Sequence, residues 1–214
     1  MNDLSKTIAA INGINDLKIS YDGGNEHVHS AVNRWTLSQW TEDSVSFDRT
    51  KIIDQVEKLE MELYEDTING TNRAVRPKQL VCTDNIITNI GLTESAKRDT
   101  GEVSSSLTHT SIGTGTTTPS ISDTDLQTED TGGSYARKGY VASGQRKVSG
   151  QTAKYGMLWD DGDVSSVPIS ITEAGVHWSV ATASNMHARV TFTVFNMTTG
   201  DLFVTQINEL MVNG

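Results

Sequence analysis

The stretch that decides the fold runs from Ser106 to Glu129 and reads SLTHTSIGTGTTTPSISDTDLQTE. Its first part, residues 107–112, alternates between two faces, and this period of two predicts a half-buried strand. A glycine-containing turn and a proline then end the strand, because glycine permits positive φ and proline fixes φ. Aspartate and threonine side chains accept backbone N–H bonds, which predicts an ordered, capped loop. The signature positions of this loop are Gly113, Thr114, Gly115, Pro119, Asp123 and Glu129.

Downstream of the loop, apolar residues alternate with polar ones in short runs that end at polar turns. In the run HARVTFTVFN, residues 187–196, the side chains of Val190, Phe192 and Val194 share one face. Residues 135–148 predict a polar strand or a hairpin, and further strands are predicted at 153–159, 167–176 and 202–210. Short strands at this spacing predict a mainly β protein, an antiparallel and jelly-roll-like β-sandwich.

Residues 48–66 carry the strongest helical pattern of the chain. Asp48 is a predicted N-cap, and Asn69-Gly70 is a predicted stop, so one amphipathic helix is expected over about residues 49–66. Its apolar stripe has the spacing four, three, four of a heptad repeat. The stripe consists of Ile52, Val56, Leu59 and Leu63. Two interpretations stay open: the helix lies on the sheet of its own chain, or these four residues form a short inter-subunit bundle.

The chain is expected to divide into two parts. Residues 1–76 are interpreted as an α-helical and extended region for attachment and oligomerisation, and residues 77–214 as the β-sandwich domain. The boundary lies in TNRAVRPKQL, residues 71–80, which is typical of an extended linker. Residues 27–40 fit neither period, and their tryptophans need a surface to bury against. Within residues 81–106, apolar residues from Ile86 to Leu92 have near-helical spacing and predict a short helix or two turns.

Composition limits the functions that this chain can have. Hydrophobic residues make up 36% of its 214 residues and aromatic residues 6%, which favours short strands and polar turns over a helix-rich enzyme. The net charge of −10 and the lack of a basic cluster argue against binding nucleic acid. No secretory signal or transmembrane span is predicted. The single cysteine, Cys82, is expected to be a small buried residue.

Motifs for catalysis are missing from the sequence. It contains no nucleophile elbow, no zinc-protease motif and no phosphate-binding glycine loop, so neither enzymatic activity nor a cofactor is expected. His27 and His29 would point the same way on a strand, and several chains around an axis could offer them to one metal ion. Two exposed polar residues are the simpler interpretation. The acidic turn at residues 160–163 supplies ligands that Ca²⁺ accepts, but a hairpin turn explains it equally.

Three segments carry a resemblance to a known class of proteins. They are IGTGTTTPSISDTDLQTE at 112–129, ITEAGV at 171–176 and ARVTF at 188–192. In this order they resemble a signature of structural proteins of tailed, bacteriophage-like viruses, including tail-fibre and collar proteins. The resemblance spans roughly residues 81–214. It implies a virion protein that is assembled in the host cytoplasm, with other virion proteins and copies of itself as partners.

Three hypotheses follow for its role. The leading one is a non-enzymatic, tail-associated fibre or collar component, with a trimer favoured. The second is a capsid decoration or vertex protein. The third is a receptor-recognition module that grips host-surface glycans through the threonine-rich loop and the face of Trp159 or Trp178.

Overall fold

Ten strands are spread along the described part of the chain. The computed structural model describes residues 30–70, 76–102, 106–133, 137–180 and 185–212. Within these ranges there are two antiparallel sheets of five strands each and two α-helices. The sheets bury one common apolar core. The prediction of a mainly β, antiparallel β-sandwich is therefore confirmed.

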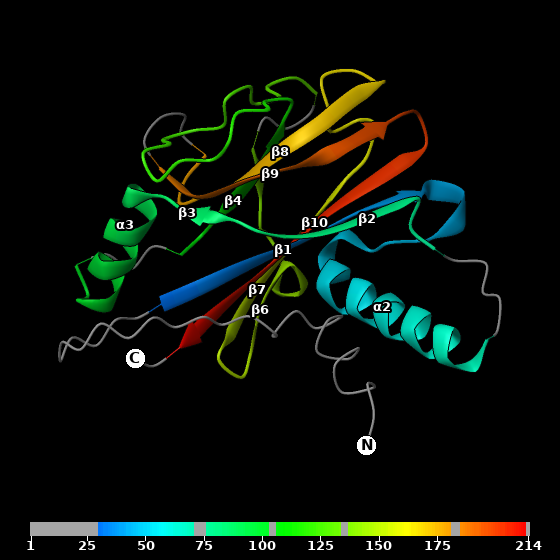
Figure 1. Ribbon diagram of the computed structural model, residues 1–214, viewed down its shortest axis with the longest axis horizontal. Helices are drawn as coiled ribbons and strands as arrows, with labels where there is room; N and C mark the ends of the chain where they lie inside the picture. Colours follow the sequence, from blue (N-terminus) through cyan, green and yellow to red (C-terminus); the bar gives the residue numbers. More distant parts are fainter. Residues whose placement is uncertain (1–29, 71–75, 103–105, 134–136, 181–184, 213–214) are drawn as a thin grey trace. The chain divides into compact units, whose positions relative to one another are not determined.

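The first sheet is organised around the long strand β1. Its strand order is β2 (Gln79–Asp84), β1 (Ser30–Thr41), β10 (Asp201–Val212), β7 (Thr152–Trp159) and β6 (Arg146–Ser149). The pairing of β1 with β10 runs from Ser30 opposite Val212 to Thr41 opposite Asp201. On its other side β1 pairs with β2, so it lies inside the sheet (Figure 1).

The second sheet carries the loop that the sequence singled out. Its strand order is β3 (Ile86–Ile87), β9 (Met186–Met197), β8 (Ile169–His177), β4 (His109–Gly113) and β5 (Lys138–Gly139). Only Asn85 separates β2 from β3, so the chain passes from one sheet to the other almost without a break (Figure 1). The expected short helix begins later than its pattern indicated, as α3 (Asn89–Asp99), because Ile86 and Ile87 pair with β9.

Aromatic side chains fill the space between the sheets. The ring centroids of Phe195 and Phe203 lie 5.0 Å apart and join β9 to β10. Trp35 and Trp159 are almost completely buried beside them. Burying one such side chain contributes roughly 1.5–3 kcal/mol, so this cluster holds the two sheets together.

The alternation of β9 changes phase within the strand. Ile171 pairs with Phe195 and Glu173 with Thr191, so the register shifts between these two pairs. As a result Phe195 points into the core, whereas Val194 is 37% exposed. The predicted common face of Val190, Phe192 and Val194 is therefore interrupted. A β-bulge of this kind explains why the apolar positions shift from Val194 to Phe195.

The predicted helix stops at the expected Gly70, but its α-helical part begins later than predicted, after Lys51, because Asp48 caps a 3₁₀ turn. The turn η2 (Arg49–Lys51) begins with Asp48, whose side chain accepts a bond from the N–H of Thr50. The α-helix α2 (Ile52–Asn69) follows and ends at Gly70, which has the left-handed φ of +68°. Two further 3₁₀ turns are η1 (Glu42–Ser44) and η3 (Ser143–Gln145).

The first half of α2 packs on the outer face of the first sheet. Ile52 and Val56 are 0% and 1% exposed, and Leu59 packs at the edge of the same cluster. Their partners on the sheet are Trp40, Leu158, Leu202 and Val204. The open interpretation of the stripe is thereby decided for Ile52 and Val56, which face their own sheet and cannot form an inter-subunit bundle. The side chain of Leu63 lies outside the described residues.

The expected domain boundary at residue 76 differs from the structure. Ser30–Val212 forms one compact unit, because β1 pairs with strands that come from both later parts of the chain. Lys78, in the expected linker, already donates its N–H to Gln39 O at 2.6 Å. Residues 1–29, including His27 and His29, lie outside the described part of the chain.

Candidate functional site: a buried carboxylate beneath the threonine loop

The loop after β4 returns to the strand from which it departs. We call residues 114–128 the threonine loop. Gly113 pairs with Glu129 in a β-bridge, and the N–H of Thr114 donates to Thr128 O at 2.9 Å. The N–H of Asp130 donates to Ile112 O at 2.9 Å. These bonds close both ends of the loop, as the sequence predicted for an ordered loop.

Glu173 of β8 holds the inside of the threonine loop. Its carboxylate is completely buried. Oε1 accepts bonds from the N–H groups of Gly115 at 2.9 Å and Thr128 at 2.8 Å. Oε2 accepts a bond from the N–H of Gln127 at 3.1 Å. One carboxylate thus fastens both arms of the loop, because charge-assisted hydrogen bonds are stronger than neutral ones.

The glycines of the signature are needed because this carboxylate is so close. A Cβ atom on Gly115 would lie 2.4 Å from Glu173 Oε1, and one on Gly113 would lie 2.7 Å from the same oxygen. A Cβ on Gly113 would also lie 2.3 Å from Thr128 O. These distances are shorter than van der Waals contact, so the Gly-Thr-Gly motif is a steric requirement of Glu173.

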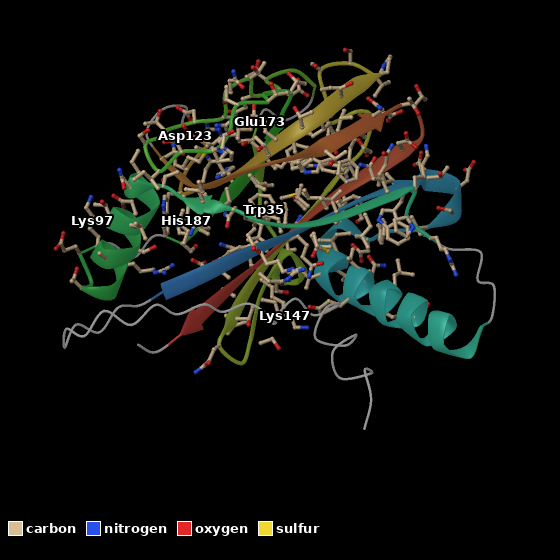
Figure 2. All side chains as sticks on the ribbon, viewed as in Figure 1. Trp35, Lys97, Asp123, Lys147, Glu173 and His187 are labelled. Carbon is tan, nitrogen blue, oxygen red and sulfur yellow. The ribbon has the colours of Figure 1, made fainter. Side chains whose placement is uncertain are left out.

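Arg189 of β9 neutralises Glu173 and reaches the far side of the loop. Its guanidinium group is buried and donates to Glu173 Oε2 from Nε at 3.0 Å and from Nη2 at 2.8 Å. Nη1 donates to Asp123 at 2.7 Å, and Nη2 donates to Thr117 O at 3.2 Å. Figure 2 shows Glu173 and Asp123 at the same end of the molecule. Arg189 thus joins the ITEAG and ARVTF segments to the loop.

A second arginine secures the end of the loop. Arg137 donates to both carboxylate oxygens of Glu129 at 2.8 Å and to Asp125 at 2.6 Å. Burial alone lowers the pKa of Arg137, but the hydrogen bonds and charges of Glu129 and Asp125 raise it above its ordinary value. Asp125 and Glu129 therefore cap the loop, as expected, and their oxygens are committed to this guanidinium group.

The tip of the loop is exposed but internally ordered. The side-chain oxygen of Gln127 accepts bonds from the N–H groups of Thr116 and Thr117, each at 2.9 Å. Asp123 accepts a bond from the N–H of Ser120 at 2.9 Å, next to the half-buried Pro119. The loop therefore presents threonine hydroxyl groups on a held backbone.

Ser111, His177 and Asn185 form a hydrogen-bonded chain beneath the loop. Ser111 Oγ lies 2.7 Å from His177 Nε2, and Asn185 Oδ1 lies 3.2 Å from His177 Nδ1. Because Arg137 donates to Asn185 Oδ1 at 3.0 Å, this oxygen is an acceptor, which assigns the ring proton to Nδ1. Burial and the charge of Arg137 lower the pKa of His177 to about 3.

Ser111, His177 and Asn185 follow the order of a nucleophile, a base and an orienting group in a catalytic triad. However, the side chains of Ser111 and His177 are both 0% exposed, between β4 and β8. A substrate atom would have to lie about 3 Å from the nucleophile, and the packed strands leave no room for it. These hydrogen bonds therefore stabilise the sheet, and the His177 imidazole that forms them is neutral.

The structure also locates the tryptophans, the cysteine and the acidic turn that the sequence singled out. Trp159 and Trp178 are 1% and 7% exposed, so neither offers the aromatic face that the glycan-binding hypothesis requires. The expectation for Cys82 is also wrong, because its side chain is exposed on β2. In the acidic turn after β7, Asp160 and Asp163 pair with Arg49. This turn is therefore an anchor for the start of α2.

The described residues contain neither a ready-made metal site nor a membrane-spanning helix. There, no group of three or more His, Cys, Asp or Glu side chains is arranged to hold a metal ion. In the same part of the chain, neither helix combines the length and apolar character needed to span a bilayer. The proposed metal ligands His27 and His29 lie outside these residues.

No protein-family model, curated protein or solved structure matches this chain. The role of the site is therefore inferred from its own geometry. The sequence pattern indicated the loop and the two later segments. It did not indicate that Glu173, Arg189 and Arg137 hold the loop. The available signal was a charged residue flanked by small or apolar residues within a strand, as in Thr-Glu-Ala-Gly and Ala-Arg-Val.

Proposed function

We propose that this chain is a non-enzymatic structural component of a tailed-virus particle, a tail-associated protein of the fibre or collar type. It assembles in the host cytoplasm as a trimer and joins other virion proteins. The observation that carries this proposal is the meeting of three distant segments, 112–129, 171–176 and 188–192, in one buried network. A resemblance that is spread along the chain gains weight when its parts touch, because they then specify one structural unit.

The chemistry of the network supports a structural role. Glu173 and Arg189 neutralise each other, and Arg137 does the same for Glu129. A buried pair with satisfied hydrogen bonds rigidifies its surroundings, whereas a catalytic acid or base needs an open side towards a substrate. This network directs its charges at the backbone of the threonine loop, which favours the maintenance of a shape over turnover.

Assembly must use surfaces other than the buried stripe of α2. Ile52 and Val56 already contact the first sheet. The exposed residues of the threonine loop, among them Thr114, Thr116 and Thr118, form a held polar surface that suits contacts with neighbouring subunits. Because the loop is ordered before assembly, little conformational entropy is lost when it docks.

The test is to locate the chain in intact particles. Virus particles from cells that produce the protein are purified, analysed by mass spectrometry and imaged by electron cryomicroscopy. Threefold or sixfold copies on the tail axis are the expected result. Copies spread over the shell, or five at each vertex, would favour a capsid decoration or vertex protein. Absence from purified particles would overturn the proposal.

A further inference from the structure

Lys138 and Asp163 form a buried contact between the two sheets. Lys138 lies on β5 of the second sheet, and Asp163 follows β7 of the first. The distance from Lys138 Nζ to Asp163 Oδ2 is 2.5 Å, and the two side chains are 7% and 4% exposed. Lys138 Nζ also donates to Leu158 O at 2.7 Å. The amine is therefore fixed against the carboxylate and shielded from water.

Two further donors converge on the same carboxylate oxygen. Arg49 Nη1 and the backbone N–H of Asp160 each donate to Asp163 Oδ2 at 2.9 Å. Donors fixed on one oxygen stabilise negative charge that develops there, as in an oxyanion hole. The ring of Trp159 covers the amine, with its centroid 5.2 Å from Lys138 Nζ. The site thus has a fixed amine, an adjacent carbonyl carbon and donors placed for an oxyanion.

Burial makes this amine more nucleophilic than an ordinary lysine. Desolvation lowers the pKa of Lys138 to about 8, although the hydrogen bond and charge of Asp163 act in the opposite direction. A larger share of the amine is then neutral near neutral pH, and only the neutral amine has a lone pair for attack. The other charged groups that act on it are Arg49 and Asp160.

We propose that Lys138 and Asp163 condense into an intramolecular isopeptide bond that staples the two sheets. This inference goes beyond the proposed function and does not depend on it. The lone pair of Lys138 Nζ attacks Cγ of Asp163, and the carbonyl electron pair moves onto Oδ2, where Arg49 and the N–H of Asp160 donate. The bond from Cγ to Oδ1 then breaks.

The atoms and charges of this step balance within the ion pair. One ammonium proton first passes to Oδ1, which gives a neutral amine beside a carboxylic acid. After the attack a second proton passes from the nitrogen to Oδ1, the electron pair on Oδ2 re-forms the carbonyl, and Oδ1 leaves as water. One hydrogen stays on the new amide nitrogen. Because Lys138 Nζ already donates to Asp163 Oδ2, protons can pass directly between the two partners. No oxidant, reductant or other reactant is needed, and the mass of the chain falls by that of one water molecule.

A comparable but exposed contact provides the internal control. Lys147 Nζ lies 2.6 Å from Asp54 Oδ1, and these side chains are 40% and 59% exposed. Water solvates both groups and no donors are fixed on the carboxylate by this contact, so no condensation is expected there. The two contacts have similar distances but different burial, so their comparison within one sample separates the effect of burial from that of proximity.

The experiment is intact-mass and peptide-mass analysis of the full chain under denaturing conditions, before and after incubation at pH 9. The expected result is the loss of one water and a branched peptide that joins Lys138 to Asp163, with Lys147 unlinked. Lys138→Arg should retain the full mass, whereas Lys147→Arg should still lose water. Asp163→Asn should lose ammonia in place of water. A wild-type chain that keeps its full mass after incubation overturns the proposal, whether or not the variants fold.

Discussion

The two sheets carry ion pairs on their outer sides, but in opposite settings. On the second sheet, Glu173 and Arg189 are buried beneath the threonine loop and bind its backbone. On the first sheet, Lys147, which Figure 2 labels, pairs with Asp54 of α2, and these side chains are 40% and 59% exposed. Ion pairs therefore fix the backbone of the threonine loop on the second sheet, whereas on the first sheet they lie on the solvated surface beside α2.

The energetic difference follows from solvation. Breaking a buried pair leaves one charge without water or a partner, which costs about 3–5 kcal/mol, whereas exposed pairs contribute about 0–1 kcal/mol. The number of ion pairs is therefore a poor guide to the free energy of unfolding. Their burial and their bonds to the backbone are better guides.

The largest effect is expected from Glu173→Gln. The substitution leaves the Arg189 guanidinium buried beside a neutral amide and replaces an oxygen that accepts backbone bonds. We expect the free energy of unfolding to fall by about 3–5 kcal/mol in urea titrations. Asp54→Asn is the matched control on the first sheet, because its side chain is 59% exposed, and its expected loss is at most about 1 kcal/mol. Equal losses for the two variants would refute the comparison.

The next effect is acid destabilisation through His177. Its pKa is about 3 in the folded protein against an ordinary value of 6.5, with Arg137 and His109 as the nearby charged or titratable groups. Below pH 6.5 the unfolded chain binds a proton that the folded chain does not bind. Stability is thus fully present above pH 6.5 and falls towards pH 3, by about 1.4 kcal/mol per pH unit.

Nuclear magnetic resonance titration of the His177 ring checks this directly. The imidazole should stay neutral at pH 5 while the protein remains folded. Protonation near pH 6.5 in the folded state would show that burial and Arg137 do not control this residue.

A smaller effect is expected from Gly115→Ala. The new Cβ would lie 2.4 Å from Glu173 Oε1 and 2.6 Å from Gln127 Cβ, so the loop or the carboxylate must shift. We expect a loss of about 1–3 kcal/mol, measured by thermal or urea unfolding. In the control Gly162→Ala, the nearest atom would be 3.4 Å from the new Cβ, which is ordinary contact. A tolerated Gly115→Ala substitution would mean that the motif is not a steric requirement.

The smallest effect is expected from Lys147→Gln. This residue forms its ion pairs with Asp54 and Glu57 in a solvated position. Unfolding curves of the variant and the wild type should coincide at high salt, because salt screens exposed charges. A clear loss of stability that persists at high salt would place this contact in the same class as Glu173.

Much of the fold could be predicted from local pattern. The runs at 153–159 and 202–210 end at polar turns and become β7 and β10, and Asp48 and Gly70 mark the ends of the helical region. These features depend on near neighbours in the sequence. The role of β1 could not be predicted, because Ser38 and Gln39 are buried together with the tryptophans, which removes the alternation.

The loop was visible in the sequence, but its fastening was not. Gly113 and Gly115 indicated a turn, whereas the reason for both glycines is a carboxylate that arrives from residue 173. A glutamate within a strand pattern normally indicates a solvent-facing position. Glu173 and Arg189 depart from that rule because each satisfies the other, a pairing that depends on strand register and on a bulge.

Hydrogen–deuterium exchange at the N–H groups of Gly115, Gln127 and Thr128 tests most directly whether Glu173 fastens the threonine loop. These amides donate to the buried carboxylate, so they should exchange as slowly as the amides of the neighbouring strands, and Glu173→Gln should accelerate all three. Rapid exchange of these amides in the wild type, while the strands remain protected, would contradict the account.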